Sequence, residues 1–327
     1  MFAKYIATFC FCFGFSLLLA GCSNTETENM LSESDVPIGF GVSVPSTGRA
    51  LLTDASQMGS FKVWGWRTPE DRNVKGQVFD GTTVTYNENS AFHWTYSPTQ
   101  SWILYNSYDF YACYPDTLSG VKFDMEGKMS FDYLDVRQPE EYNVDKALDV
   151  LHAYTREIVE DKPPTRVLLD FKHLLANVNF NIFKSAENED DRIVVTGIVV
   201  GGMNCIGSLK QNEWTYYDTE TSYFYTLPNK ELNTDTPVSF NNLLMIPQSL
   251  SEDQPVDFIV QYNYTQAGSD KTSQKYLMVN LPDSPSWDAG KKIGYSATIY
   301  VDKNISFATP VIEAWGTEQV SGTVIIK

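Results

Sequence analysis

The chain has 327 residues, with 24 basic and 41 acidic side chains and a formal net charge of −17. This length suits two domains, and the acidity argues against nucleic acid or an anionic lipid surface as a partner. Aromatic residues make up 14% of the chain, which argues against a disordered protein and favours strands.

The N-terminal segment has the pattern of a secretory signal. Lys4 supplies a positive start, an apolar run covers Tyr5–Ala20, and small residues precede Cys22. The run is shorter than the roughly 20 apolar residues that cross a bilayer. The sequence therefore predicts a signal peptide over residues 1–21.

The tetrapeptide Leu19-Ala20-Gly21-Cys22 resembles the lipobox of bacterial lipoproteins. This resemblance implies that Cys22 is acylated and becomes the mature N-terminus of an outer-membrane lipoprotein, since several acyl chains anchor a protein stably. The alternative is an ordinary signal peptide with a cysteine near its cleavage site. The residues that follow are polar and acidic, which predicts a flexible tether over residues 22–35.

Beyond the tether, short runs of β-branched and aromatic residues alternate with Gly, Pro, Asn and Asp turns. This pattern is typical of an all-β protein, and it predicts one β-sandwich over residues 36–165 and another over residues 166–327. The expected strands are Ile38–Val44, Phe61–Trp66, Gln77–Tyr86, Tyr108–Tyr114, Lys128–Tyr133, Val167–Phe183, Ile193–Met203, Ser239–Ile246, Asp257–Thr265, Lys275–Leu281, Ile293–Val301 and Val311–Ala314.

One expected strand shows the period of two especially clearly. Val178, Phe180 and Ile182 alternate with Asn179 and Asn181. Because successive side chains of a strand point to opposite faces, we expect the apolar residues to face a core and the asparagines to face water.

The best helical signal lies in Asp145–Val159, whose apolar residues recur at helical spacing. We expect a short helical insertion there. Pro163-Pro164 then stops any helix and marks a linker, which places the domain boundary near residue 165. The residues at helical spacing are Ala147, Leu148, Leu151 and Tyr154.

Side chains that carry chemistry form no recognisable catalytic, metal-binding or phosphate-binding motif. We therefore expect no enzyme, no cofactor and no metal. Cys113 and Cys205 remain for the fold, and two thiols in strands are favoured over a disulfide between them. Exposed aromatic rings stacking on sugars would make the chain a surface glycan-binding lipoprotein instead, with Trp94 and Trp102 as the first candidates.

Several stretches resemble the fimbrillin family, the subunits of type V pili, in their order and spacing. The resemblance extends over essentially the whole chain. It implies two tandem transthyretin-like, Greek-key β-sandwich domains and a structural or adhesive pilus subunit on the cell surface. The stretches are Asp149–Ala153, Val167–Phe180, Leu243–Gln248, and Trp287–Gly290 followed by Tyr295, Tyr300 and Trp315.

The resemblance also implies that an arginine-specific protease removes the first strand together with the lipid. The first expected strand carries four apolar residues on one face, and Pro, Ser and Gly around Arg49 predict an exposed loop. Cleavage would then leave Ala50 as the new N-terminus, while the alternative is a surface arginine in a turn. The apolar residues of the first strand are Ile38, Phe40, Val42 and Val44.

The C-terminal tail is the expected donor strand, because its apolar residues also alternate. It would fill the gap in a neighbouring subunit, since a sandwich that lacks a strand leaves backbone groups and an apolar groove open. The alternative is an ordinary edge strand of its own domain. The expected partners are other pilus subunits and a membrane through the lipid, with a host or bacterial surface ligand left open. The tail residues are Val320, Gly322, Val324 and Ile326.

Overall fold

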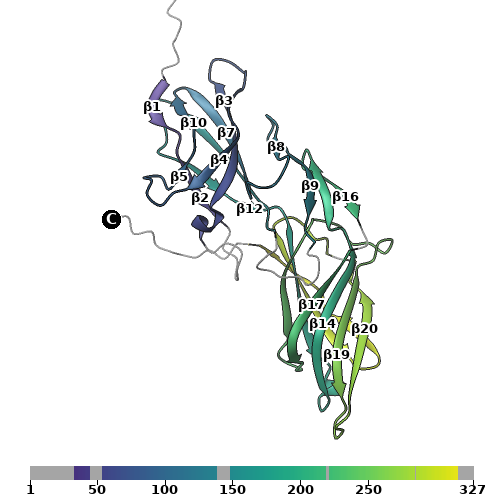
Figure 1. Cartoon of the computed structure of the whole chain (residues 1–327). Coiled ribbons are helices and arrows are strands. Elements are labelled where there is room, and N and C mark those ends of the chain that lie inside the picture. Colours follow the sequence, from purple (N-terminus) through teal and green to yellow (C-terminus); the bar gives the residue numbers. More distant parts are fainter. Residues whose placement is uncertain (1–32, 45–53, 138–147, 219–220, 284, 316–327) are drawn as a thin grey trace, which may run out of the picture.

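The computed structural model describes residues 33–44, 54–137, 148–218, 221–283 and 285–315. The expectation of an all-β, sandwich-like protein is confirmed, since strands dominate the described residues and their helical structure is limited to short 3₁₀ turns such as Ala55–Met58 and Ala186–Asn188. In these residues no helix is long and apolar enough to cross a membrane. Figure 1 shows two groups of strands with a smaller sheet between them.

The first group, here called the N-terminal sandwich, is a six-stranded sheet that faces a smaller layer. The sheet order is β12-β10-β7-β3-β4-β5, and the smaller layer consists of the pairs β1-β6 and β11-β2. Its core is aromatic, with Phe61, Phe79 and Phe110 fully buried. The strands are β1 (Glu33–Pro37), β2 (Phe40–Ser43), β3 (Ser60–Pro69), β4 (Gly76–Tyr86), β5 (Trp94–Thr95), β6 (Ser101–Ile103), β7 (Asn106–Tyr114), β10 (Leu151–Val159), β11 (Val167–Asp170) and β12 (Lys172–His173).

The second group, the C-terminal sandwich, packs two sheets against each other. One has the order β18-β13-β21-β22 with β23 also paired to β21, and the other has the order β17-β14-β19-β20. Phe180 of one sheet stacks on Phe258 of the other at 4.9 Å between ring centroids. The strands are β13 (Ala176–Lys184), β14 (Arg192–Met203), β17 (Thr221–Glu231), β18 (Val238–Met245), β19 (Asp257–Thr265), β20 (Thr272–Asn280), β21 (Lys291–Tyr300), β22 (Asn304–Phe307) and β23 (Val311–Ala314).

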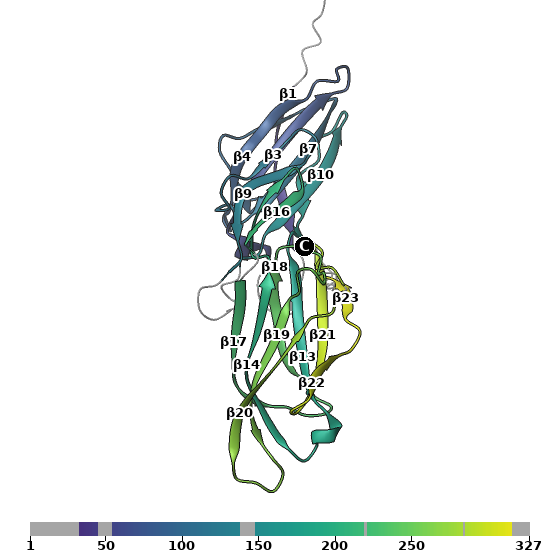
Figure 2. The ribbon, with the colours of Figure 1, turned by 90° about the vertical axis from the view of Figure 1, so that its right-hand side faces the viewer.

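A four-stranded junction sheet connects the two sandwiches. It combines β8 (Lys122–Phe123) and β9 (Met129–Asp135) with β15 (Ile206–Lys210) and β16 (Glu213–Asp218), in the order β16-β15-β9-β8. Strands that are far apart in the sequence therefore pair directly. Figure 2 shows the sandwiches end to end, and Figure 1 shows β9 and β16 beside the N-terminal sandwich and above the C-terminal one.

The expected helical insertion at Asp145–Val159 is wrong. Leu151–Val159 is strand β10, which pairs with β7 along its whole length. Leu151 and Ala153 are buried in the core while Tyr154 is exposed, so the burial follows a period of two and not the helical period. A full ladder of backbone hydrogen bonds with β7 outweighs a weak helical pattern.

The structure differs from the predicted segment boundaries at two places. Residues Glu33–Pro37, at the end of the predicted tether, already form strand β1. Val167–Asp170, expected to open the second domain, pairs with β2 of the N-terminal sandwich, and β12 pairs with β10. The N-terminal sandwich therefore extends beyond residue 165, because strand pairing depends on spatial neighbours and not on order in the chain.

Of the two asparagines of β13 expected to face water, Asn179 is buried and Asn181 is half-buried. Asn177 and Asn179 are buried, and the Asn179 amide donates to Asn177 Oδ1 at 2.9 Å. Asn179 Oδ1 accepts from the Asn242 backbone amide, also at 2.9 Å. These side chains satisfy one another, which makes burial of the polar face tolerable.

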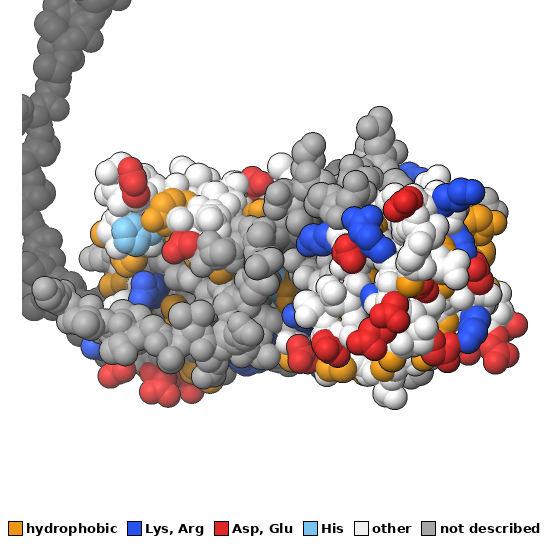
Figure 3. All heavy atoms as spheres, turned by 90° about the horizontal axis from the view of Figure 1, so that it is seen from below, with side chains coloured by type: hydrophobic (Ala, Val, Ile, Leu, Met, Phe, Trp, Pro, Cys, Tyr) orange, Lys and Arg blue, Asp and Glu red, His pale blue; other side chains and the backbone are white. Residues whose placement is uncertain are grey.

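Acidic and basic side chains both occur on the face of the molecule seen from below. Figure 3 shows acidic side chains along one edge of the face seen from below, with lysines and arginines between other acidic groups. This surface agrees with the acidic net charge of the chain.

Candidate functional site

The first strand, here meaning residues 33–44 with β1 and β2, lies between two segments of the smaller layer. β1 pairs with β6 in antiparallel fashion, and β2 pairs with β11 in parallel fashion from Phe40↔Val167 to Ser43↔Asp170. In the described part of the chain, β6 and β11 do not pair with each other. The first strand is therefore what links the two segments.

Ile38 and Phe40 of the first strand enter the core of the N-terminal sandwich. Both are buried, and the Phe40 ring lies 5.6 Å from Phe79 and 6.0 Å from Phe110 between centroids, in edge-to-face contacts. Burying one such side chain is worth about 1.5–3 kcal/mol. Val42 and Val44 are partly buried and pack against the same core, so the predicted apolar face of this strand is the face that the structure buries.

Backbone hydrogen bonds hold the first strand on both edges. On one edge the Ile38 amide donates to Gln100 O at 2.8 Å; on the other the Val167 amide donates to Gly39 O at 2.8 Å. The Tyr96 hydroxyl donates to Ile38 O at 2.7 Å, and burial raises the pKa of that hydroxyl, which keeps it a donor. Removal of the strand would leave these groups without partners beside an open apolar groove.

Several predicted site residues lie outside the residues that the structure describes. They are the lipidation candidate Cys22, the cleavage candidates Arg49 and Ala50, and the tail residues Val320, Gly322, Val324 and Ile326. The position of Arg49 and Ala50 in the chain still shows which segments they connect. The described chain stops at Val44, directly after the first strand, and resumes at Asp54, so residues 45–53 join the first strand to the rest of the fold.

The segment that precedes the tail is held by a strand pairing and by one aromatic side chain. β23 pairs with β21, and all four of its side chains are exposed. Trp315 follows and is buried, with its ring parallel to that of His173 at 3.3 Å between centroids. His173 Nδ1 lies 3.0 Å from Asp149 Oδ2, and both side chains are buried. The root of the tail is thus attached to the C-terminal sandwich through β21 and to the N-terminal sandwich through β12.

The two tryptophans expected to stack on sugars are in the wrong place for that role. Trp94 and Trp102 are buried, and Trp102 packs at 4.9 Å on the Tyr108 ring. Their exposure could not be inferred from residue type alone. Among the described residues the most exposed large rings are tyrosines, including Tyr105, Tyr133, Tyr154, Tyr217 and Tyr276, and Phe92 is exposed as well.

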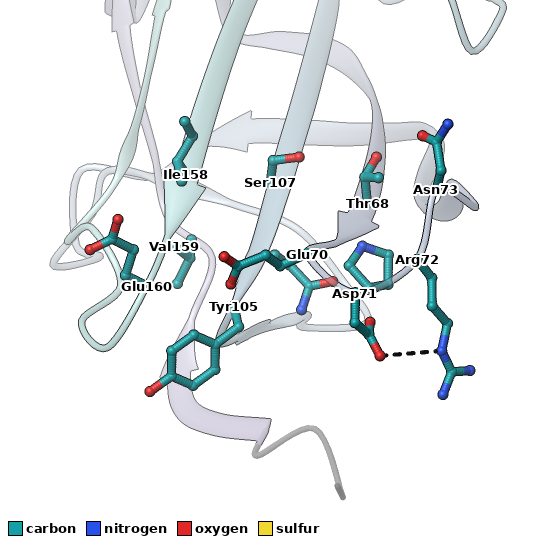
Figure 4. Close-up of a pocket in the computed structure, with 12 residues that line it drawn as sticks. Thr68, Glu70, Asp71, Arg72, Asn73, Tyr105, Ser107, Ile158, Val159 and Glu160 are labelled. Atoms are coloured by element: carbon teal, nitrogen blue, oxygen red, sulfur yellow. Dashed lines mark ion pairs between the residues drawn. The ribbon is translucent and has the colours of Figure 1, made fainter.

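A hollow of about 510 Å³ lies at the end of the N-terminal sandwich where β3 and β10 end and β7 begins. Glu70, Glu160 and Tyr105 lie on one side of it, and Asp71 pairs with Arg72 on the other, at 3.5 Å between Oδ2 and Nε (Figure 4). β1 begins beside this end, opposite Ile103. The hollow therefore adjoins the start of the first strand.

The two cysteines and the candidate metal-ligating side chains are further candidates for a chemical site. Cys113 and Cys205 are buried and are not joined by a disulfide. Burial raises the pKa of the Cys113 thiol to about 12, so this thiol is unreactive at neutral pH. Among the described residues no group of histidine, cysteine or carboxylate side chains is arranged to hold a metal ion.

Of the strands that flank the first strand, the sequence does not predict β6, and it predicts β11 only as the start of one long strand, Val167–Phe183, of the second domain. The structure divides this stretch into β11, β12 and β13. The alternation of Val167 and Leu169 with exposed Leu168 is a strand signal, but it cannot reveal the parallel partner.

Comparisons with known proteins identify a family and similar solved structures. The sequence matches the family model described as fimbrillin-like over residues 49–315. No curated protein sequence matches the chain. A fimbrial protein from Bacteroides vulgatus superimposes with a TM-score of 0.59 at 17% identity, covering 85% of this chain and 99% of that one.

Two other solved structures are similar over comparable lengths. A protein assigned to cell adhesion from Bacteroides ovatus has a TM-score of 0.49 at 14% identity, covering 87% of this chain and 98% of that one. The tip fimbrial protein of Porphyromonas gingivalis, with its C-terminus truncated, has a TM-score of 0.39 at 11% identity, covering 86% and 98%. The family match extends over most of the chain, from the segment after the first strand to Trp315. This chain belongs to the fimbrillin-like family.

Proposed function

We propose that the chain is a lipidated, non-enzymatic subunit of a type V pilus that assembles on the cell surface by exchange of its first strand. Family membership supports a role as a pilus subunit. The observation that carries the mechanism is the position of the first strand, which fills the core between β6 and β11. This strand is continuous with the rest of the fold only through residues 45–53.

Lipidation at Cys22 would hold the unassembled subunit at the outer membrane. The lipobox-like tetrapeptide and the signal-like segment before it support this step. Cleavage after Arg49 would cut the one covalent connection between the first strand and the fold. The lipid and the first strand would then leave together, and Ala50 would become the N-terminus.

The tail has the right pattern to replace the first strand. Apolar side chains of the first strand occupy alternate positions from residue 38 to residue 44, and the tail has Val320, Val324 and Ile326 at alternate positions with Gly322 in the remaining place. Both segments therefore present a four-position face of the same period. A tail from a second subunit can restore the ladder with β6 and β11 and cover the core.

The test uses the full-length chain treated with an arginine-specific protease. Mass spectrometry should find Ala50 as the new N-terminus, and size-exclusion chromatography with electron microscopy should find polymers. Arg49→Gln should stay uncut and monomeric, whereas Arg72→Gln, an exposed arginine in another loop, should behave as the wild type. A chain ending at Trp315 should be cut but should not polymerise.

Cleaved protein with an intact tail that stays monomeric would contradict strand exchange. If the protease does not cut at Arg49, a specific protease site inserted within residues 45–53 releases the strand instead. Polymer formation after that cut supports exchange without supporting Arg49 as the natural site. A monomer after that cut refutes the mechanism.

A further inference from the structure

A row of aromatic rings crosses the outer face of the six-stranded sheet, the face that points away from the N-terminal core. Trp64 of β3, Tyr111 of β7 and Tyr154 of β10 occupy paired positions on adjacent strands. Phe123 of β8 covers part of the row, at 5.2 Å from Trp64 and 5.3 Å from Tyr111 between centroids. Tyr154, at the end of the row, is 52% exposed.

Tyr154 is held rigidly although it is exposed. One face of its ring stacks on Tyr111 at 5.0 Å, with 25° between the planes, and its hydroxyl donates to Asp109 Oδ1 at 3.0 Å. Asp109 is itself held by Arg156 at 3.6 Å and Lys75 at 3.5 Å. An aromatic ring fixed in this way has lost its conformational freedom before any ligand arrives, which favours binding.

Tyr154 lines a hollow of about 690 Å³, here called the junction pocket, where the two sandwiches meet the junction sheet. Ligand pockets typically have volumes of about 300–1,000 Å³ and combine apolar walls with a few polar groups. The apolar wall includes Leu174, Leu209 and Trp214. Elements of both sandwiches contribute, so the pocket exists only in the assembled fold.

Three polar side chains line the junction pocket with hydrogen-bonding capacity to spare. His152 is half-buried and has no hydrogen-bond partner among the described residues; burial and the nearby Lys172 lower its pKa, so the ring is neutral at pH 7. The side-chain Oδ1 of Asn212 accepts from the Met129 backbone amide at 2.8 Å, which leaves the side-chain NH₂ group of Asn212 available. Glu126 lies exposed on the β8–β9 turn and forms no ion pair within the described residues.

We propose that the junction pocket binds a neutral hexose unit of a glycan. The apolar face of the sugar stacks on the open face of Tyr154, and its hydroxyls bond to His152, Glu126 and Asn212. A neutral imidazole, an amide and a carboxylate together offer both donors and acceptors, as sugar hydroxyls require. An anionic sugar is disfavoured because Glu126 and the acidic net charge repel it.

Isothermal titration of the full-length chain with methyl glycosides of glucose, galactose, mannose and N-acetylglucosamine tests the proposal. At least one glycoside should bind saturably, and Tyr154→Ala should weaken its affinity about three- to tenfold. Tyr276→Ala is the matched control, because Tyr276 is 72% exposed on β20 and does not line the pocket. This control should leave the affinity unchanged.

Calorimetry of each variant reports whether it is folded. If Tyr154→Ala does not fold, Glu126→Gln on the exposed turn takes its place and should weaken binding severalfold. The proposal is overturned if no neutral glycoside saturates the protein, or if the folded variants bind as tightly as the wild type. Preferential binding of the methyl glycoside of N-acetylneuraminic acid, or of lysine methyl ester, would also overturn it. None of these outcomes bears on pilus assembly.

Discussion

Gly127, in the turn between β8 and β9, allows this turn to close over Tyr111. Its backbone has a φ of +82°, and a Cβ at this position would lie 2.2 Å from a ring carbon of Tyr111. Gly268 has a similar φ of +73° but no atom within 4 Å of such a Cβ. Comparing the two glycines therefore separates the cost of a left-handed backbone from the cost of steric overlap with Tyr111.

Gly127→Ala should lower the free energy of unfolding by about 1–3 kcal/mol more than Gly268→Ala does. Both substitutions impose left-handed strain on alanine, but only the first also forces the Tyr111 ring to move. Urea denaturation of the two variants and the wild type measures the difference. Equal losses would mean that the turn does not pack on Tyr111 as the structure shows.

Buried tyrosines make stability depend on pH in the alkaline range. Burial, aided by the charge of Asp302, raises the pKa of the Tyr262 hydroxyl from 10.0 to about 12. The folded protein therefore holds this proton more tightly than the unfolded chain. The contribution is complete below about pH 10 and is lost as the pH rises from 10 to 12.

Tyr262→Phe should accordingly make the decline in stability between pH 10 and 12 less steep. Part of the decline should remain in the variant, because burial also raises the pKa of Tyr295 to about 12. Urea denaturation at a series of pH values from 8 to 11.5 gives the two slopes. Parallel curves for variant and wild type would show that Tyr262 titrates alike in the folded and unfolded states.

At the scale of elements, periodicity predicted strands well where one face is buried and the other exposed. β21 is an example, since Ile293, Tyr295, Ala297 and Ile299 are buried and alternate with half-buried residues. β10 was misassigned because its apolar residues fit a helical spacing as well as an alternating one. The long ladder with β7 decides between them, and it is a property of two strands and not of one.

The first strand also shows that the sequence does not reveal which strands pair. Its apolar face was predicted correctly, with Ile38 and Phe40 buried. Its parallel pairing with β11 joins segments more than a hundred residues apart. Such pairing leaves no local pattern, because a strand alternates in the same way beside any partner.

At the scale of the whole molecule, the junction sheet makes the two sandwiches interdependent. One cluster of buried residues runs from Trp64 and Trp66 of β3 through β9 into the C-terminal sandwich. Phe131 of β9 lies within it, buried, at 5.5 Å from the Trp214 ring of β16. The contact between the sandwiches is therefore apolar core and not only a linker.

Phe131→Ala should lower the free energy of unfolding by about 3–5 kcal/mol, as deletion of a buried phenylalanine ring usually does. It should also separate the single calorimetric transition expected of the wild type into two, because the shared core is lost. Tyr133→Ala, at an exposed position of the same strand, is the control and should change stability by less than about 0.5 kcal/mol. A single unshifted transition in Phe131→Ala would contradict a shared core.

The sequence by itself determined the all-β class, most of the strands, the apolar face of the first strand and the resemblance to fimbrillins. These features follow from local alternation and from short motifs, which neighbouring residues encode. Only the tertiary structure decided that β10 is a strand, that β11 completes the N-terminal sandwich and that β9 pairs with β15. It also decided that Trp94 and Trp102 are buried while Tyr154 is open to solvent, because burial depends on which distant segment covers a side chain.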